Sequence, residues 1–129
     1  MRKYTGGCEC RHIRYSLSGE PTSPHFCHCR MCQRLAGAPI VAWVDFPISS
    51  LEYEGAEPSL YQSSENTQRG FCPKCGSSIF ALDTEGECIC VTIATLDHPE
   101  FIAPEYETYK ESSPPWMNID SLNIANQER

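Results

Sequence analysis

The nine cysteines are the residues of this chain whose type and spacing could do chemistry. Seven of them form three groups: a C-x-C pair at Cys8 and Cys10, a C-x-C-x-x-C triplet at Cys27, Cys29 and Cys32, and a C-x-x-C pair at Cys72 and Cys75. Where thiols are kept reduced, clustered cysteines more often hold a metal than form disulfides. The odd cysteine count points the same way, so the spacing predicts metal sites.

The two pairs together supply four thiolates, which is the closed tetrahedral ligand set of a structural zinc site. In "GFCPKCGSS", Pro73 presets the turn, and Gly76 permits the positive φ that turns backbone amides toward the sulfurs. We therefore predict one structural Zn²⁺ held by Cys8, Cys10, Cys72 and Cys75. The alternative is that these cysteines are unligated core residues, but such residues have no reason to cluster twice.

The triplet leaves three ligands for a second zinc ion. A zinc held by three protein ligands keeps its fourth position for water or substrate, and it lowers the pKa of whatever binds there. A site already rich in thiolate suits a further sulfur, from a thiol substrate. The alternative is that a nearby histidine such as His25 closes the triplet into a second structural site. His28 lies in the middle of an extended C-x-C, so we expect it to point away from the metal.

Cys88 and Cys90 form one more C-x-C pair, alternating with Ile89 and Val91. Cysteine in such a strand commonly serves as a small buried apolar residue, so we expect core packing. A further ligand pair or redox-active thiols are the alternatives.

The elements that must position these groups are short. Ten prolines and eight glycines interrupt the apolar segments at close intervals, which is typical of an all-β fold with many turns. The pattern predicts strands at 12–17, 40–46, 51–53, 60–62, 68–71, 78–82, 90–95 and 106–109, and one short helix at 31–35 that ends at the Gly37-Ala38-Pro39 breaker. We expect one zinc-binding β domain over residues 1–118 and a loosely ordered tail over 119–129. We expect Trp116 to anchor the segment that begins at Ser112 against the core.

Composition excludes several classes of protein. The chain has 129 residues, the size of one domain, and its net charge is −7, from 10 basic and 17 acidic residues. Nucleic-acid-binding domains carry a basic patch, so we expect no nucleic-acid partner. The opening "MRKYTGGCEC" turns polar at once, and no apolar run approaches the roughly 20 residues that span a bilayer. We expect a cytoplasmic protein without a membrane partner.

The ordered cysteine groups resemble a known family. C-x-C, then C-H-C-x-x-C followed by small residues, then "GFCPKCGSSI" and "TLDHPE", resemble the glutathione-dependent formaldehyde-activating enzyme family, whose domain centromere protein V shares. The resemblance runs from about residue 7 to residue 116. It implies an Mss4-like fold of several short coiled antiparallel β-sheets around structural zinc, with at most one or two short helical turns.

The resemblance also implies an activity. Cys8, Cys10, Cys72 and Cys75 would hold the structural zinc, and Cys27, Cys29 and Cys32 a catalytic zinc, giving two Zn²⁺ per chain with partial occupancy allowed at the triplet. The family reaction is addition of the glutathione thiol to formaldehyde, as in S-(hydroxymethyl)glutathione synthase, which is a carbon–sulfur lyase. Glutathione carries two carboxylates. Arg30, Arg34 and Lys74 are the candidates to bind them, with a solvated surface role as the alternative for each.

Two features depart from the family pattern: the Cys88 and Cys90 pair, and "LAGA" where a serine often precedes the glycine. Neither changes a ligand, but both bear on the substrate. The sequence therefore supports three hypotheses: a zinc-dependent carbon–sulfur lyase for glutathione and formaldehyde or a related small aldehyde, a non-catalytic zinc-structured binding module for a protein partner, and a metal or redox handler.

Overall fold

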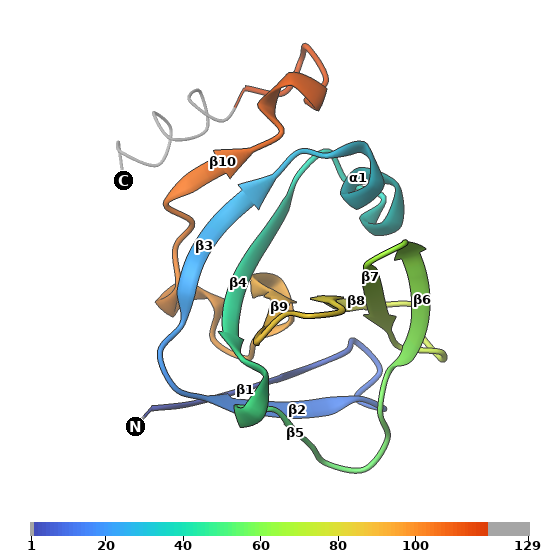
Figure 1. Ribbon diagram of the computed structural model, residues 1–129, viewed down its shortest axis with the longest axis vertical. Coiled ribbons are helices and arrows are strands. Elements are labelled where there is room, and N and C mark those ends of the chain that lie inside the picture. Colours follow the sequence, from blue (N-terminus) through green and yellow to red (C-terminus); the bar gives the residue numbers. More distant parts are fainter. Residues whose placement is uncertain (1, 119–129) are drawn as a thin grey trace.

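The computed structural model describes residues 2–118 and forms two β-sheets (Figure 1). The three-stranded sheet has the order β1 (Lys3–Gly7), β2 (Arg14–Ser18), β5 (Glu52–Tyr53). The seven-stranded sheet has the order β10 (Tyr106–Thr108), β3 (Thr22–Cys27), β4 (Val41–Pro47), β9 (Cys88–Thr92), β8 (Ser78–Asp83), β7 (Thr67–Phe71), β6 (Ser59–Ser64). Neighbouring strands pair antiparallel except β10 and β3, which are parallel.

Helical structure is confined to α1 (Arg30–Ala36) and four 3₁₀ turns within the described residues: η1 (Ile48–Ser50), η2 (Ile93–Thr95), η3 (Pro99–Phe101) and η4 (Lys110–Ser112). The predicted all-β fold is confirmed. Each predicted strand has a counterpart, although the last residues predicted for β9 form the turn η2.

Two strands were missed by the sequence analysis, and each has a local reason. β1 ends in two glycines, which are poor strand formers. β3 contains Pro24, and proline argues against a strand. The structure accommodates Pro24 at an irregularity, where the register against β4 shifts between Thr22 and His25 and Ser23 adopts a φ of 52°.

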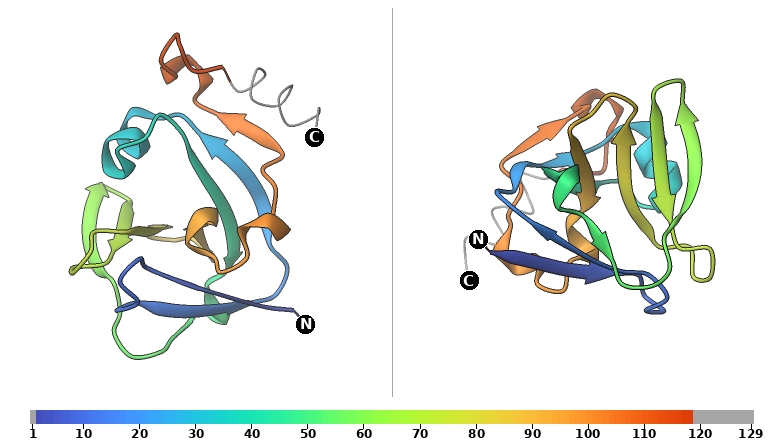
Figure 2. Two further views of the ribbon diagram at one scale, coloured as in Figure 1. Left: turned by 180° about the vertical axis from the view of Figure 1, so that it is seen from behind. Right: turned by 60° about the horizontal axis from the view of Figure 1, so that its bottom comes forward.

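The main core lies between the two sheets: in Figure 1 and in the left-hand view of Figure 2, the small sheet lies below β8 and β9 of the large sheet. Leu17 from β2 and Phe46 from β4 are almost completely buried, as are Ile79 from β8 and Val91 from β9. Full burial of one such side chain contributes about 1.5–3 kcal/mol. A second, smaller cluster of Cys27, Cys32, Val41 and Trp43 packs elsewhere on the seven-stranded sheet. Cys27 and Cys32 of the triplet are therefore also packing residues of this second cluster.

Asp97, in the "TLDHPE" segment, joins the β1–β2 hairpin to the chain after η2. Its carboxylate accepts hydrogen bonds from the Thr5 hydroxyl at 2.6 Å and from the Arg14 guanidinium at 2.9 and 2.6 Å. The Asp97 backbone N–H also donates to the Thr5 carbonyl. Hydrogen bonding from Arg14 lowers the pKa of Asp97 to about 2, so the carboxylate stays charged at neutral pH.

The prediction that Trp116 anchors its segment against the core is wrong. Its side chain is 74% exposed, because it lies in a turn closed by the Met117 N–H and the Pro114 carbonyl, beyond the last strand. The predicted tail, 119–129, lies outside the described residues, so the domain boundary stays a prediction. None of the helices over residues 2–118 is long and apolar enough to cross a membrane.

Candidate metal centres

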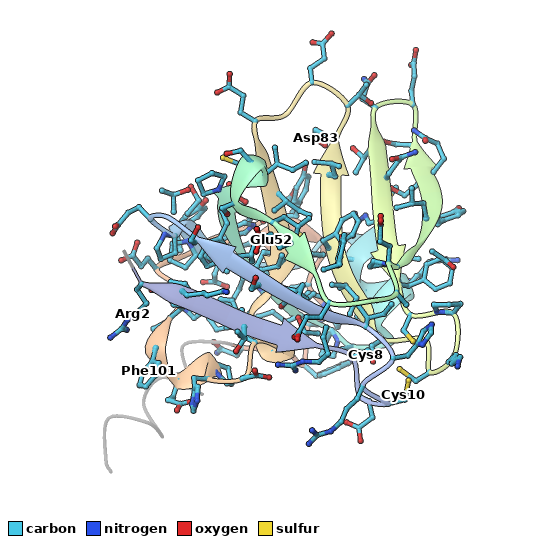
Figure 3. All side chains as sticks on the ribbon, turned by 90° about the horizontal axis from the view of Figure 1, so that it is seen from below. Arg2, Cys8, Cys10, Glu52, Asp83 and Phe101 are labelled. Carbon is cyan, nitrogen blue, oxygen red and sulfur yellow. The ribbon has the colours of Figure 1, made fainter. Side chains whose placement is uncertain are left out.

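The sulfurs of Cys8, Cys10, Cys72 and Cys75 come together from opposite ends of the sequence. The four sulfurs all lie within 4.8 Å of one another. Cys8 and Cys10 lie at the end of the β1–β2 hairpin, where Figure 3 labels them, and Cys72 and Cys75 follow β7. We call this set the four-cysteine group. Cys8 and Cys72 are buried, whereas Cys10 and Cys75 are exposed, so the group sits at the edge of the main core.

Backbone N–H groups point at these sulfurs. The Ile13 N–H donates to Cys8 Sγ at 3.2 Å, and the N–H groups of Lys74 and Cys75 donate to Cys72 Sγ at 3.3 and 3.4 Å. Gly76 has a φ of 81°, the positive value that the sequence analysis required, and its N–H closes the turn onto the Cys72 carbonyl. Such donors stabilise thiolates, which are the form of cysteine that binds a metal.

The sulfurs of Cys27, Cys29 and Cys32 form a second set, also within 4.8 Å of one another, which we call the three-cysteine group. Cys27 is the last residue of β3, Cys29 precedes α1, and Cys32 lies in the first turn of α1. Hydrogen bonding with the Cys32 sulfur, 3.5 Å away, lowers the pKa of Cys27 to about 5 and raises the pKa of Cys32. The pair therefore favours one thiolate already before a metal binds.

The helix that carries Cys32 is held by the group itself. Cys29 is the N-cap of α1, and its sulfur accepts a hydrogen bond from the Cys32 N–H at 3.2 Å. At the other end Gly37 adopts a left-handed φ of 64°, as expected of the predicted breaker. The spacing C-x-x-C thus caps a helix and places two sulfurs on one side of its first turn.

The chain between Cys27 and Cys29 is fixed by the C-terminal part of the domain. His28 is almost fully buried, and its Nε2 lies 2.9 Å from Glu107 Oε1 on β10. The buried Gln33 amide donates to the His28 carbonyl at 2.6 Å and to the Ser112 carbonyl at 3.0 Å. His28 does not join the three sulfurs, as the sequence analysis expected. Its side chain ties the triplet to β10.

His25, the candidate for closing the triplet, has other contacts. Its Nδ1 lies 2.7 Å from the Ser23 carbonyl, and its ring stacks on Tyr106 with centroids 5.1 Å apart. Among residues 2–118, the three sulfurs alone form the close set of possible ligand atoms at the triplet. This arrangement supports a site with an open fourth position.

Arg69, on β7, is a residue of this region that the sequence analysis missed. Its Nη1 donates to Cys32 Sγ at 3.5 Å, and its guanidinium lies 5.6 Å from the centre of the Trp43 ring. Arg69 is far from the triplet in the sequence, and nothing in its neighbouring residues predicts a contact with the Cys32 sulfur. Only the pairing of β7 within the large sheet reveals it.

The other candidate residues belong to two different places: Arg30 and Arg34 lie on α1, and Lys74 lies at the four-cysteine group. Arg30 donates to the Gln33 side chain at 2.7 Å. Arg34 lies in the last turn of α1, and Lys74 lies in the turn of the four-cysteine group. Their proposed role in binding carboxylates stays a prediction.

Cys88 and Cys90 differ from each other. Cys88 is exposed, so the prediction that it packs in the core is wrong; it lies at the end of β9, opposite Pro47. Cys90 is partly buried against the second cluster. Burial, with the nearby negative charge of Asp45, raises the pKa of the Cys90 thiol, which disfavours a reactive thiolate there.

Both groups fit a tetrahedral metal ion with thiolate ligands. Zinc–sulfur bonds of about 2.3 Å in a tetrahedron place the sulfurs about 3.8 Å apart. Neighbouring sulfurs lie 3.6 and 3.7 Å apart in the four-cysteine group and 3.5 Å apart in the three-cysteine group. Either group can therefore hold a metal ion, and its chemistry suits zinc.

The fold and site define an all-β domain that has two cysteine groups able to hold metal. The sequence model of the family described as "Glutathione-dependent formaldehyde-activating enzyme" matches residues 3–112. The chain belongs to this family. This confirms the resemblance found from the cysteine spacing.

Two individual proteins are similar to this chain. A Schizosaccharomyces pombe protein named "Uncharacterized lyase C29B12.13" is 29% identical over 87 residues, which are 67% of this chain and 63% of that protein. The chain thus spans less than two thirds of this relative. A crystal structure of a Rhodobacter sphaeroides protein superposes with a TM-score of 0.62 at 26% identity, covering 81% of this chain and 99% of that one.

Proposed function

We propose that this protein is a zinc-dependent carbon–sulfur lyase that joins a thiol to formaldehyde or a related small aldehyde at the three-cysteine group. The observation that carries the proposal is a set of three sulfurs with no fourth protein ligand among the described residues. Family membership and the lyase name of the fission-yeast relative support the reaction class. The family name makes glutathione and formaldehyde the first substrates to test.

The chemistry is an addition. The sulfur of the thiol forms a bond to the carbonyl carbon, and the thiol proton ends on the carbonyl oxygen. A zinc ion held by Cys27, Cys29 and Cys32 would lower the pKa of a thiol that takes its open position. Formaldehyde needs little activation, so holding it beside the sulfur would supply most of the rate advantage.

The chain's own residues would prepare the site. Arg69 places a positive charge beside the Cys32 sulfur and so offsets the negative charge that gathers when a further thiolate approaches. The contacts of His28 with Glu107 and of Gln33 with Ser112 hold the triplet loop to the C-terminal part of the domain, which keeps the three sulfurs in place.

In this proposal the four-cysteine group has a structural role. Its ligands come from both ends of the domain, and its buried members Cys8 and Cys72 belong to the main core. Metal binding there would close a long loop as well as a local turn, so it would stabilise the fold directly.

The experiment is metal analysis of the full chain combined with X-ray absorption spectroscopy and a formaldehyde-consumption assay. We expect two zinc ions per chain, one with four sulfur ligands and one with three sulfurs and a lighter ligand. We also expect faster loss of formaldehyde in the presence of a thiol than without protein. Four protein ligands at both zinc ions, or no acceleration with any thiol, would contradict the proposal.

A zinc-structured binding module for a protein partner is the second candidate. Exposed aromatic rings along the C-terminal part favour it: Tyr106, Tyr109 and Trp116 are 46, 59 and 74% exposed. A partner bound through these rings would be retained when Cys29 is changed to serine, whereas lyase turnover would be lost.

A further inference from the structure

A cavity of about 440 Å³ opens beside the three-cysteine group. It lies between α1 and the β6–β8 strands, which face each other in Figures 1 and 2. Cys32 lines it, so a molecule whose sulfur joins the three-cysteine group can extend its body into this space. We call it the α1–β6 cavity.

The lining of the α1–β6 cavity is apolar and partly aromatic. Its large apolar and aromatic side chains are Leu35 from α1, Val41 and Trp43 from β4, Leu60 and Tyr61 from β6, Phe71 from β7 and Phe80 from β8. Gly70 contributes because Phe80 packs on it: a Cβ at Gly70 would lie 2.2 Å from the Phe80 ring. Such a surface recognises aromatic or branched aliphatic groups.

Among the lining residues, all of which lie in the described part of the chain, Arg69 has the one charged side chain. Its Nη1 already donates to Cys32 Sγ and its Nε donates to Ser63 Oγ at 3.4 Å. The lining contains no carboxylate that could pair with an ammonium group.

Glutathione fits this lining poorly. It carries two carboxylates, an ammonium group and two peptide groups, and an ionised group placed in an apolar space without a partner is strongly disfavoured. One guanidinium can pair with one carboxylate, which leaves the other charges unmatched. A thiol with an apolar body leaves no charge unmatched.

We infer that the thiol handled at the three-cysteine group carries an aromatic or branched aliphatic body held in the α1–β6 cavity, rather than the tripeptide body of glutathione. The inference rests on the proposed function and names its substrate class. The reaction is unchanged: the sulfur bonds to the aldehyde carbon, the thiol proton goes to the carbonyl oxygen, and no oxidant or reductant is needed.

The test uses the full chain with cobalt in place of zinc, because sulfur-to-cobalt absorption reports a new thiolate ligand. Three thiols are titrated: 2-phenylethanethiol, 2-mercaptoethanol and glutathione. We expect 2-phenylethanethiol to bind at least about tenfold tighter than 2-mercaptoethanol, since its ring leaves water on binding. Glutathione should bind no tighter than 2-mercaptoethanol.

Variants tie the preference to the cavity. Leu35→Gln and Leu60→Gln change lining residues that are 40 and 55% exposed, so the fold should be retained. Each should weaken binding of 2-phenylethanethiol about threefold to tenfold and leave 2-mercaptoethanol unchanged. Met31→Gln is the matched control, because Met31 is a 38% exposed apolar residue of the same helix that does not line the cavity.

Two failures are distinguishable. Tightest binding of glutathione, or equal loss of all three thiols in the Leu35 and Leu60 variants, would overturn this inference and leave the proposed function standing. A spectrum that no thiol changes would overturn the proposed function, and this inference with it.

Discussion

The guanidinium of Arg69 donates a hydrogen bond to the sulfur of Cys32, with 3.5 Å between Nη1 and Sγ, although the two residues are 37 positions apart in the sequence. The same guanidinium lies over the ring of Trp43, and all three residues line the α1–β6 cavity. Three thiolates around a divalent ion carry a net charge of −1, and a further thiolate would make it −2. A fixed positive charge at this point therefore favours the approach of a thiolate.

Changing Arg69 to alanine should lower turnover of thiol and aldehyde by about tenfold to a hundredfold, since a hydrogen bond to a charged group contributes about 1.5–3 kcal/mol. Zinc content should stay at two ions per chain. Arg69→Lys should recover part of the loss, because it keeps the charge but not the planar contact with Trp43. Steady-state rates together with zinc per chain make the measurement.

The matched control for Arg69 is the Arg30→Ala/Arg34→Ala double variant. It removes two arginines that flank the triplet on α1 but do not line the α1–β6 cavity. We expect a smaller effect on turnover than in Arg69→Ala. A larger effect would show that substrate carboxylates are met on the helix, as the family resemblance implies, and would contradict the assignment to Arg69.

The two cysteine groups should differ in their contribution to stability. Structural zinc contributes roughly 10–16 kcal/mol of apparent binding free energy, against a net domain stability of about 5–15 kcal/mol. Cys72→Ser, Cys10→Ser and Cys75→Ser should therefore leave unfolded or insoluble protein. Cys10 and Cys75 are exposed, so their effect would report lost metal rather than lost packing.

Cys29→Ser should stay folded, keep one zinc ion and lose turnover. Serine is itself a preferred N-cap, so α1 should keep the cap that Cys29 provides. Soluble yield, zinc per chain and a thermal melt of each variant make the comparison. If Cys29→Ser unfolds the protein as thoroughly as Cys75→Ser does, the three-cysteine group is structural.

Asp97→Asn should destabilise the domain by about 1 kcal/mol, because its carboxylate pairs with Arg14 at a partly exposed site where solvent screens the charges. The pKa of Asp97 is lowered from 3.8 to about 2 in the folded state, so its contribution is fully present above pH 4. It is lost as the pH falls through about 2. Thermal melts of both proteins at pH 8, 7, 6 and 5 should thus show a constant difference. A difference that shrinks within this range would contradict the lowered pKa.

Gly70→Ala should cost about 1–3 kcal/mol of stability, because the new methyl group would overlap the Phe80 ring. Urea unfolding measures the change. Gly86→Ala is the matched control: its nearest atom would be the Asp83 carbonyl at 3.3 Å, and we expect a change below about 0.5 kcal/mol. Equal losses in the two variants would show that Phe80 can move aside.

The cysteine groups could be predicted from the sequence because the turns that place their sulfurs are formed by neighbouring residues. The two sulfurs of a C-x-C or C-x-x-C unit are placed by one turn, and Gly76 has the positive φ that the turn after Cys72 and Cys75 requires. The strands after residue 40 were readable for the same reason, since turn residues bound each one. β3 could not be predicted in this way. It forms despite Pro24 because it pairs with β10 on one side and β4 on the other, and the residues of β3 alone do not reveal those partners.

Tertiary structure alone decided what surrounds the three-cysteine group. Arg69 reaches Cys32 only because β7 lies beside β8 in the large sheet, and His28 meets Glu107 only because β10 pairs in parallel with β3. The apolar α1–β6 cavity is lined by residues from five elements, and no single one of these elements has a sequence that predicts a binding site. Sequence spacing determined the ligand groups because they depend on local turns. Long-range strand pairing determined the charge and shape of the site because those depend on residues far apart in the chain.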